Sequence, residues 1–299
     1  MKMHEIPAKA IAALLLGVLL AAPAGARDGS PINETRALAA DGAVSVNNMA
    51  GSIVVKGWDR NEVAISGTLG ADAERLEISG DGKALNVNVH YPSHRRGGVD
   101  DTYLELRVPA RARLQLDAVS ADVAVAGTSG AITAKSVSGD VRLDVGSGEI
   151  NASTVSGDLT VKAPSFKTAL NSVSGDLSAI GVRGTLKAET ISGELAVQGG
   201  AFRDVSVQSV SGDLHLDLAL EGSARLTAET LSGDIDLQLP KAPDARLTMK
   251  TFSGDLQNGF ASGGNDGDRR KMSTTLGAGR GDIDLHTFSG DIRIAPVRR

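Results

Sequence analysis

The chain has 299 residues, of which 41% are hydrophobic and 22% are charged, so it carries enough apolar material for a core and is not a disordered chain. Its formal net charge of −5 argues against nucleic-acid binding, which requires a basic face. The absence of Cys excludes disulfides and thiolate chemistry, and with 3% aromatic residues the core must be built from Val, Leu, Ile and Ala.

Residues 1–26 are predicted to be a secretion signal peptide. Two lysines lead into the apolar run AIAALLLGVLLAA, and Ala24 and Ala26 stand at the small-residue positions that precede cleavage. The run is shorter than the ~20 residues that span a membrane, so an uncleaved anchor is the weaker alternative. No Cys follows it, which excludes a lipoprotein anchor. We therefore expect an exported protein, in the periplasm, at the cell surface or secreted, with no transmembrane segment after cleavage.

Residues 27–42 are predicted to be a flexible lead-in, and residues 43–113 to form irregular β coils or a cap. The segments GAVSVNNMAGSIVVKGWDRNEVAIS, ALNVNVHYP and TYLELRVP alternate apolar and polar residues between turn signals, which is typical of half-buried strands. They lack a regular spacing. Repeat proteins need such atypical terminal units to cover their ends.

A repeat begins near residue 114 and continues to residue 299. Each unit contains a Ser-Gly-Asp motif or a close variant, whose acidic residue serves as a marker: Asp122, Asp140, Asp158, Asp176, Glu194, Asp213, Asp234, Asp255 and Asp291. The first four steps between markers are 18 residues, and the last is 36, twice the basic step. We therefore expect one unit without the motif between residues 255 and 291, interrupted by a Gly-rich, charged excursion loop over 258–271.

Apolar residues recur eight and six positions before the marker and one and three positions after it. In one unit these are Ile150, Ala152, Leu159 and Val161, with polar residues between them. Alternation on both sides of the motif predicts two strands joined by a bend, and neither strand buries its apolar face unless successive units stack. The predicted fold is all-β: a single-chain parallel β-solenoid with about 18 residues and two short strands per coil. A propeller blade would need about 40 residues, and a sandwich requires no constant register.

A column of hydroxyl residues stands four positions before the marker. The parity of the strand turns it toward the core, so its hydroxyl groups must find partners in each other or in the backbone of the bend. We interpret it as a structural ladder, because a catalytic hydroxyl would be a single residue. Its members are Ser136, Thr154, Ser172, Thr190, Ser209, Thr230, Thr251 and Thr287.

The Gly and acidic residues of the motif are interpreted as a structural bend. Gly allows a positive φ, and the carboxylate accepts backbone N–H groups as in an Asx turn. The bend residues are Gly139, Asp140, Gly157, Asp158, Gly175, Asp176, Gly193, Glu194, Gly212, Asp213, Gly233, Asp234, Gly254, Asp255, Gly290 and Asp291.

A calcium column formed by Asp140, Asp158 and Asp176 is the less favoured alternative. Carboxylates stacked about 4.8 Å apart repel one another, and a cation between coils would remove that repulsion. Each coil nevertheless supplies a single acidic residue and lacks the Gly-Gly-x-Gly context of calcium-binding solenoids. We therefore expect no metal site.

The chain offers no set of residues typical of an enzyme. Its histidines are scattered, and no Ser-His-Asp set, metal-ligand spacing or phosphate loop is present, so we expect no catalytic residue and no cofactor. The one concentrated polar and aromatic patch, HYPSHRR at residues 90–96, is explained equally well by a loop beside the cap. The Arg-Gly-Asp tripeptide at residues 280–282 is more simply a turn leading into a strand than a receptor site, because Ile283 and Leu285 occupy core columns.

Several segments resemble the bacterial putative-adhesin family of unknown function: the serial motifs SVSGD, TVSGD and TISGE, the ending LGAGRGDIDLHTFSGDIRI and the opening GAVSVNNMAGSIVVKGWDRNEV. The resemblance covers residues 43–299 and implies an exported, non-enzymatic β-solenoid, without functional residues that can be carried over. We expect an adhesin-like binding or scaffold protein of the bacterial envelope with a protein or glycan ligand. A structural or envelope-stress accessory that forms homo-oligomers through the solenoid ends is the alternative, followed by a glycan-active enzyme.

Overall fold

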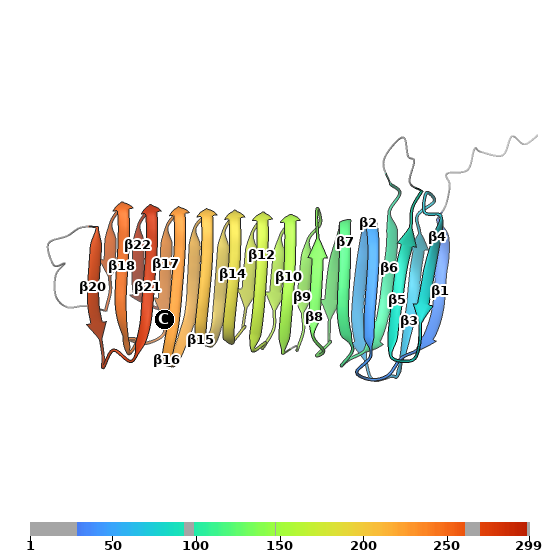
Figure 1. Ribbon diagram of the computed structural model, residues 1–299, viewed down its shortest axis with the longest axis horizontal. Coiled ribbons are helices and arrows are strands. Elements are labelled where there is room, and N and C mark those ends of the chain that lie inside the picture. Colours follow the sequence, from blue (N-terminus) through green and yellow to red (C-terminus); the bar gives the residue numbers. More distant parts are fainter. Residues whose placement is uncertain (1–28, 93–98, 147, 261–269, 298–299) are drawn as a thin grey trace, which may run out of the picture.

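The computed structural model describes residues 29–92, 99–146, 148–260 and 270–297. Their regular structure is all β, as predicted: twenty-two strands join in one hydrogen-bonded network and stack into an elongated, solenoid-like rod (Figure 1). In these ranges no helix is long and apolar enough to cross a membrane. The predicted signal peptide over 1–26 lies outside the described residues.

The middle of the rod is regular, and each of its units contributes a longer strand, a bend at the Ser-Gly-Asp motif and a shorter strand. We call such a unit a coil. The longer strands are β8 (Ile132–Ser136), β10 (Glu149–Ser156), β12 (Lys167–Ser174) and β14 (Gly184–Ser192). The shorter strands are β9 (Val141–Asp144), β11 (Leu159–Lys162), β13 (Leu177–Ile180) and the first residues of β15 (Leu195–Ser211). Like positions of successive coils pair in parallel, for example Ile150 with Thr168 and Leu159 with Leu177.

The core lies between the two faces of the rod and contains the four predicted apolar columns, with further buried residues such as Val145 and Phe202 beside them. In the coil of β12 and β13, Leu170, Leu177 and Ala179 are buried. Thr168, a polar residue in an apolar column, is also buried, and its hydroxyl group lies 2.6 Å from that of Ser165. Each of these two buried hydroxyl groups thus has the other as its hydrogen-bond partner.

The C-terminal coils are not stacked in chain order. This part of the rod contains β16 (Leu214–Ser232), β17 (Ile235–Leu239), β18 (Ala245–Ser253), β19 (Leu256–Asn258), β20 (Lys271–Leu276), β21 (Gly281–Ser289) and β22 (Ile292–Pro296). β21 pairs with β16 on one side and with β18 on the other, and β22 lies likewise between β17 and β19. In Figure 1 the red strands β21 and β22 lie between the orange strands of the two neighbouring coils. The last coil of the chain is thus an internal coil of the rod.

The predicted unit without a motif between residues 255 and 291 is therefore wrong. The 36-residue step equals two periods in length, but its described residues add only β20, which pairs antiparallel with the outer edge of β18. The connection over residues 240–244 runs past the space of one coil before β18 begins. The strands β21 and β22 later fill that space. Most of the predicted excursion loop over 258–271 falls on residues 261–269, outside the described part.

At the N-terminal end, too, the strands are not stacked in chain order. Its strands are β1 (Ser30–Ala37), β2 (Ala43–Trp58), β3 (Glu62–Leu69), β4 (Arg75–Gly80), β5 (Ala84–His90), β6 (Thr102–Pro109) and β7 (Arg113–Ala126). β2 follows both faces of the rod and lies between β7 on one side and β5 and β6 on the other. β4 then pairs antiparallel with β5, β3 with β6, and β1 with β3.

The segment 27–42, expected to be a flexible lead-in, contains β1. This strand pairs with β3 along its whole length, because the outer edge of β3 would otherwise present unpaired backbone groups. Glu34 and Arg36 follow the buried Ile32 at alternate positions of β1 and form an ion pair at 2.7 Å, with 45% of each side chain exposed. Charged, antiparallel edge strands of this kind discourage further strand pairing.

Candidate binding surface at the corner of the rod

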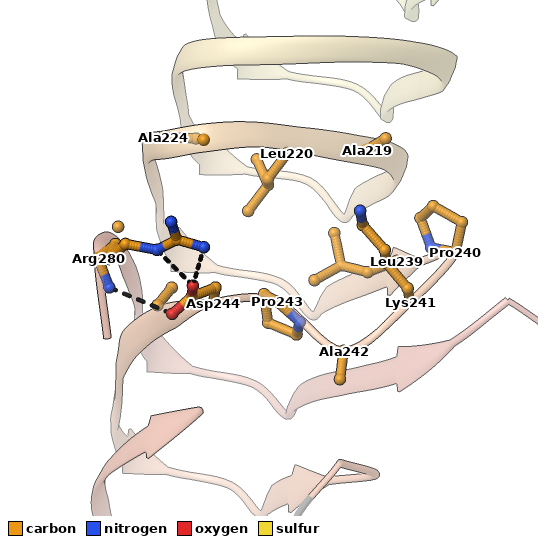
Figure 2. Close-up of a pocket in the computed structure, with 13 residues that line it drawn as sticks. Ala219, Leu220, Ala224, Leu239, Pro240, Lys241, Ala242, Pro243, Asp244 and Arg280 are labelled. Carbon is orange, nitrogen blue, oxygen red and sulfur yellow. Dashed lines mark hydrogen bonds and ion pairs between the residues drawn. The ribbon is translucent and has the colours of Figure 1, made fainter. Parts of the chain in front are cut away.

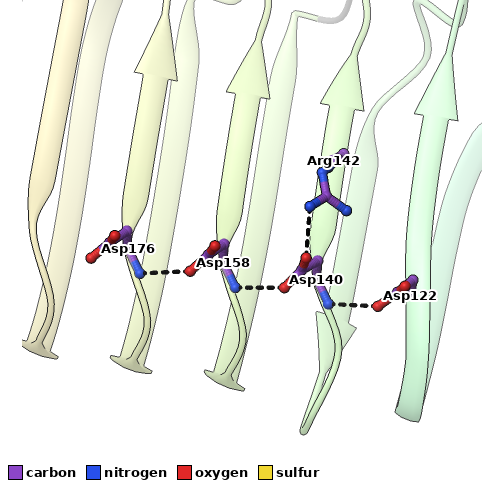
Figure 3. Close-up of polar contacts among 5 residues, drawn as sticks. All are labelled: Asp122, Asp140, Arg142, Asp158 and Asp176. Carbon is purple, nitrogen blue, oxygen red and sulfur yellow. Dashed lines mark hydrogen bonds and ion pairs between the residues drawn. The ribbon is translucent and has the colours of Figure 1, made fainter.

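The acidic markers form a hydrogen-bonded column along the corner where the two faces meet. The backbone N–H of Asp140 donates to Oδ1 of Asp122 at 3.0 Å, that of Asp158 to Asp140 at 2.9 Å, and that of Asp176 to Asp158 at 3.1 Å (Figure 3). Each carboxylate therefore ties its own coil to the next one. We call this set of acidic markers the acidic column.

The same bond recurs along the rod and follows the spatial order of the coils. Asp291 N–H donates to Asp234 at 2.7 Å, and Asp255 N–H donates to Asp291 at 2.8 Å, although Asp291 comes later in the chain. The step from Glu194 to Asp213 lacks the bond, and the Glu194 carboxylate instead lies 3.7 Å from Nε2 of His215. The predicted backbone acceptor is thus present, but its donor lies in the next coil and not within the same bend.

These bonds bear on the calcium alternative. Oδ1 of Asp140 and of Asp158 already accepts a backbone N–H, and Arg142 binds the second oxygen of Asp140 at 2.6 Å. The pKa of Asp140 lies below its usual value because the N–H of Asp158 donates to its carboxylate; partial burial opposes this shift, and the Arg142 guanidinium adds to it. Within the described ranges no three His, Cys, Asp or Glu side chains are grouped to hold a metal ion. Calcium is not needed to explain the column.

The glycine of the bend is required by the close approach of the coils. Gly175 has φ of +133°, and a Cβ atom there would lie 2.2 Å from the carbonyl oxygen of Gly157 in the preceding coil. A side chain at this position would therefore clash with the backbone as well as strain it.

The hydroxyl column lies directly beneath the bends and is buried in every coil. Thr251 donates to the carbonyl oxygen of Gly290 at 3.0 Å, and Thr287 donates to that of Gly233 at 3.1 Å. In both cases the acceptor belongs to the neighbouring coil in space. These two hydroxyl groups bond to the backbone of the bends, as the structural interpretation expects, whereas those of Thr154 and Ser209 are buried without a hydrogen-bond partner among the described residues.

A column of exposed apolar side chains lies at the corner, one residue after the hydroxyl column, and sequence reasoning missed it. Each coil from β2 onward contributes one member, with 40–58% of its surface exposed. In spatial order the members are Met49, Val119, Val137, Val155, Val173, Ile191, Val210, Leu231, Phe288 and Phe252. The signal was available, because an apolar residue stands three positions before every marker, out of phase with the core alternation. We call this set the apolar column.

The apolar and acidic columns run side by side along the rod, and we call the pair the corner ridge. Exposed serines such as Ser156 and Ser174 stand between them in each coil. At the usual spacing of about 4.8 Å between parallel strands, the ten apolar members extend over about 43 Å. Soluble proteins rarely expose a contiguous apolar surface of this extent unless it binds something.

The end of the apolar column near β18 is aromatic. The rings of Phe252 and Phe288 stack with their centroids 4.8 Å apart and their planes 6° from parallel. The guanidinium of Arg270 lies 5.5 Å from the centroid of Phe252. The Phe252 ring is thus in contact with both an aromatic and a cationic group of the chain.

A hollow of about 200 Å³ lies beside the connection over residues 240–244, where the chain passes the place of one coil (Figure 2). Leu220, Leu239 and Pro243 line it, and Arg280 donates to Asp244 at its edge at 2.5 Å. Arg280 belongs to the Arg-Gly-Asp tripeptide, and Gly281 and Asp282 begin β21, as the simpler interpretation expects.

The histidines described in the structure lie apart from one another. His90 lies 2.8 Å from Glu77 near the N-terminal end, and His215 is beside Glu194 on the ridge. His286 lies in β21. His94 and most of the HYPSHRR patch fall outside the described part of the chain. The structure brings together no nucleophile, base and oxyanion donor from the residues that it describes.

Comparison with known proteins gives one family and several solved structures. The family model described as Toastrack DUF4097 matches residues 42–295. Similar structures include a putative adhesin from Parabacteroides merdae, with 10% identity, coverage of 90% of this chain and 97% of that chain, and a TM-score of 0.44. A putative lipid binding protein from Parabacteroides distasonis has 14% identity, coverage of 90% and 98%, and a TM-score of 0.45. The comparison with curated proteins found no match. The resemblance to the putative-adhesin family is confirmed.

Proposed function

The chain belongs to the Toastrack DUF4097 family, and from this premise we propose that it is an exported, non-enzymatic binding or scaffold protein of the bacterial envelope. The corner ridge is its binding surface. The observation that carries the proposal is the apolar column, because ten consecutive coils expose an aliphatic or aromatic side chain where a solvated bend needs none. The regular part is further inferred to be a parallel β-solenoid of about 18 residues and two short strands per coil, which the register of β10, β12 and β14 supports.

Two properties make the ridge suitable for binding. The core columns and the bonds between coils hold its side chains on a rigid backbone, so little conformational freedom is lost on contact. Its apolar side chains also lie in one continuous row, so a single partner can bury many of them at once.

The alternatives have less support. End-to-end self-assembly would need accessible strand edges, whereas the outer strands β1 and β4 at the N-terminal end carry charged residues such as Glu34, Arg36, Arg75 and Glu77. A glycan-active enzyme would need a pair of acid and base groups and aromatic platforms. Seven of the nine carboxylates of the acidic column already accept a hydrogen bond from a backbone N–H.

The proposal is tested with a triple variant of the apolar column, Val155→Ser, Val173→Ser and Ile191→Ser. The matched control is Lys135→Ser, Asn171→Ser and Gln208→Ser, at exposed outward positions of the same face. Binding of the purified proteins to isolated cell envelopes of the producing bacterium is measured by surface plasmon resonance. We expect at least a tenfold loss of binding for the first variant and none for the second, with unchanged thermal unfolding of both. Equal envelope binding by the ridge variant would overturn the proposal.

A further inference from the structure

The corner ridge carries a dense line of negative charge beside its apolar column. Nine coils each contribute one carboxylate, from Asp122 to Asp255 in spatial order, and all but the half-buried Asp140 are exposed. Among the described residues, the ion pairs formed by this column are those of Asp140 with Arg142 and of Glu194 with His215, the latter only when the histidine is protonated. In the part of the chain that the structure describes, no cationic side chain lies within ion-pair distance of the other seven carboxylates.

This charge decides between the partners that an apolar ridge could take. A second copy of the chain would bring its own acidic column against the first, and each close pair of like charges would oppose association by about 1 kcal/mol in water. An anionic lipid surface would be repelled in the same way. A glycan would stack on free aromatic faces, whereas the Phe252 ring already stacks on Phe288 and has the Arg270 guanidinium 5.5 Å from its centroid.

We propose that the corner ridge binds a cationic amphipathic polypeptide, whose apolar side chains pack on the apolar column while its Lys or Arg side chains pair with the acidic column. The inference rests on the proposed function, since it names the partner of the same surface. Arg270 shows the required contact within the chain itself, because its guanidinium lies against Phe252 at the end of the apolar column. Guanidinium groups bind both to aromatic faces and to carboxylates.

The dimensions of the ridge indicate the length of such a partner. The aliphatic members from Val119 to Leu231 occupy seven coils, which extend over about 29 Å at about 4.8 Å per step. An α-helix of about 19 residues has the same length, and it presents apolar side chains on one stripe about every 5.4 Å. A helix with one apolar stripe and cationic flanks can therefore contact every coil of the aliphatic part.

The experiment uses the full chain and three synthetic 20-residue helical peptides as probes. The first has Leu at helical 3–4 spacing with Lys elsewhere, the second has Glu in place of every Lys, and the third has Ser in place of every Leu. Affinity is measured by fluorescence anisotropy at low and high salt. We expect the Lys-Leu peptide to bind at least tenfold more tightly than either of the others, and its affinity to fall as salt rises.

Two protein variants locate the contact on the ridge. Asp158→Asn with Asp176→Asn removes two charges but keeps an oxygen that accepts the N–H of the next coil, so the fold should persist. We expect a five- to tenfold loss of affinity for the Lys-Leu peptide and a weaker salt dependence. Asp144→Asn with Asp217→Asn, at exposed positions in β9 and β16 four residues after the marker, is the matched control and should leave the affinity unchanged.

The outcomes separate this inference from the proposed function. One outcome is that the triple Val155, Val173 and Ile191 variant loses envelope binding, while the ridge pair of Asp→Asn changes and its control pair bind the Lys-Leu peptide equally. The ridge would then be a binding surface whose partner is not cationic. Equal binding of the Lys and Glu peptides would lead to the same conclusion. Ridge-dependent dimers in sedimentation velocity, or ridge-dependent binding to phosphatidylglycerol vesicles with no peptide binding, would also overturn the inference.

Discussion

The buried hydroxyl column and the exposed apolar column are neighbours in the chain with opposite burial. Ser172 exposes 4% of its surface, whereas Val173, the next residue, exposes 41%. The same inversion recurs in coil after coil, with the polar residue inside and the apolar residue outside. Hydroxyl groups such as those of Thr251 and Thr287 stabilise the bends by donating to their carbonyl oxygens, so their burial serves the fold. The exposed valines have no such part in the fold, and the proposed binding role accounts for them.

The strongest test of this comparison uses two truncations in one coil. Leu170→Ala removes a fully buried side chain of the core, and we expect a loss of about 2–5 kcal/mol in the free energy of unfolding. Val173→Ala removes an exposed side chain of the apolar column and should change stability by less than about 0.5 kcal/mol. Urea denaturation of both variants measures the difference. Similar destabilisation by the two changes would mean that the apolar column belongs to the core.

The next prediction concerns the bend, which lies between the acidic column and the hydroxyl and apolar columns. The need for glycine in this bend is tested at Gly175. Gly175→Ala places a Cβ against the carbonyl oxygen of Gly157 at a strained φ, and we expect a loss of about 1–3 kcal/mol. Gly148→Ala is the matched control, since a Cβ there meets no atom within 4 Å. A Gly175 variant as stable as this control, measured by thermal unfolding, would refute the close-approach argument.

The bonds between coils in the acidic column are tested at Asp158. Asp158→Ala removes the acceptor of the Asp176 N–H, and we expect a loss of about 0.5–1.5 kcal/mol in the free energy of unfolding. Asp158→Asn keeps an accepting oxygen and should lose less than half as much. If urea denaturation gives equal losses for the two variants, charge and not hydrogen bonding stabilises the column.

The pH dependence of stability should report on Asp140. Its pKa is lower in the folded chain than in the unfolded chain, so its contribution is complete above its usual value of 3.8 and is lost as the pH falls through the folded value. The difference in thermal midpoint between the wild type and Asp140→Asn should therefore shrink as the pH falls below about 4. A difference that stays constant between about pH 6 and pH 2.5 would contradict this assignment.

The smallest effect is expected from the removal of metal ions. We expect the thermal midpoint to be the same with EDTA and with added calcium, because the backbone N–H groups already occupy one oxygen in each bonded carboxylate. A rise in midpoint with calcium that Asp158→Asn abolishes would restore the calcium column of Asp140, Asp158 and Asp176.

Much of the fold could be predicted because every coil repeats the same constraints. Leu170 and Leu177 stand at fixed distances from their marker, and such positions are buried only if the coils stack in register. The burial of Ser172 also followed from its parity in the strand. Periodicity alone was sufficient for these features, since each concerns one coil and an identical neighbour.

The order of the coils could not be predicted from the same pattern. The edges of stacked parallel strands are equivalent, so nothing in the local sequence of Ile283 indicates that it pairs with Leu226 and Leu247. The apolar column was missed for a different reason. Val173 does not follow the two-residue alternation that marks buried positions, and an apolar residue outside that alternation gives no signal for the core.

The internal position of the last coil has a consequence for the way the rod folds. β18 and β19 are complete at Asn258, yet their parallel neighbours β21 and β22 begin only at Gly281. A ribosome therefore delivers the coils in an order that differs from their order in space. Contacts between strands far apart in sequence slow folding, and domains form progressively during synthesis. We therefore expect the C-terminal end of the rod to be closed by a late, non-local step that the regular middle does not require.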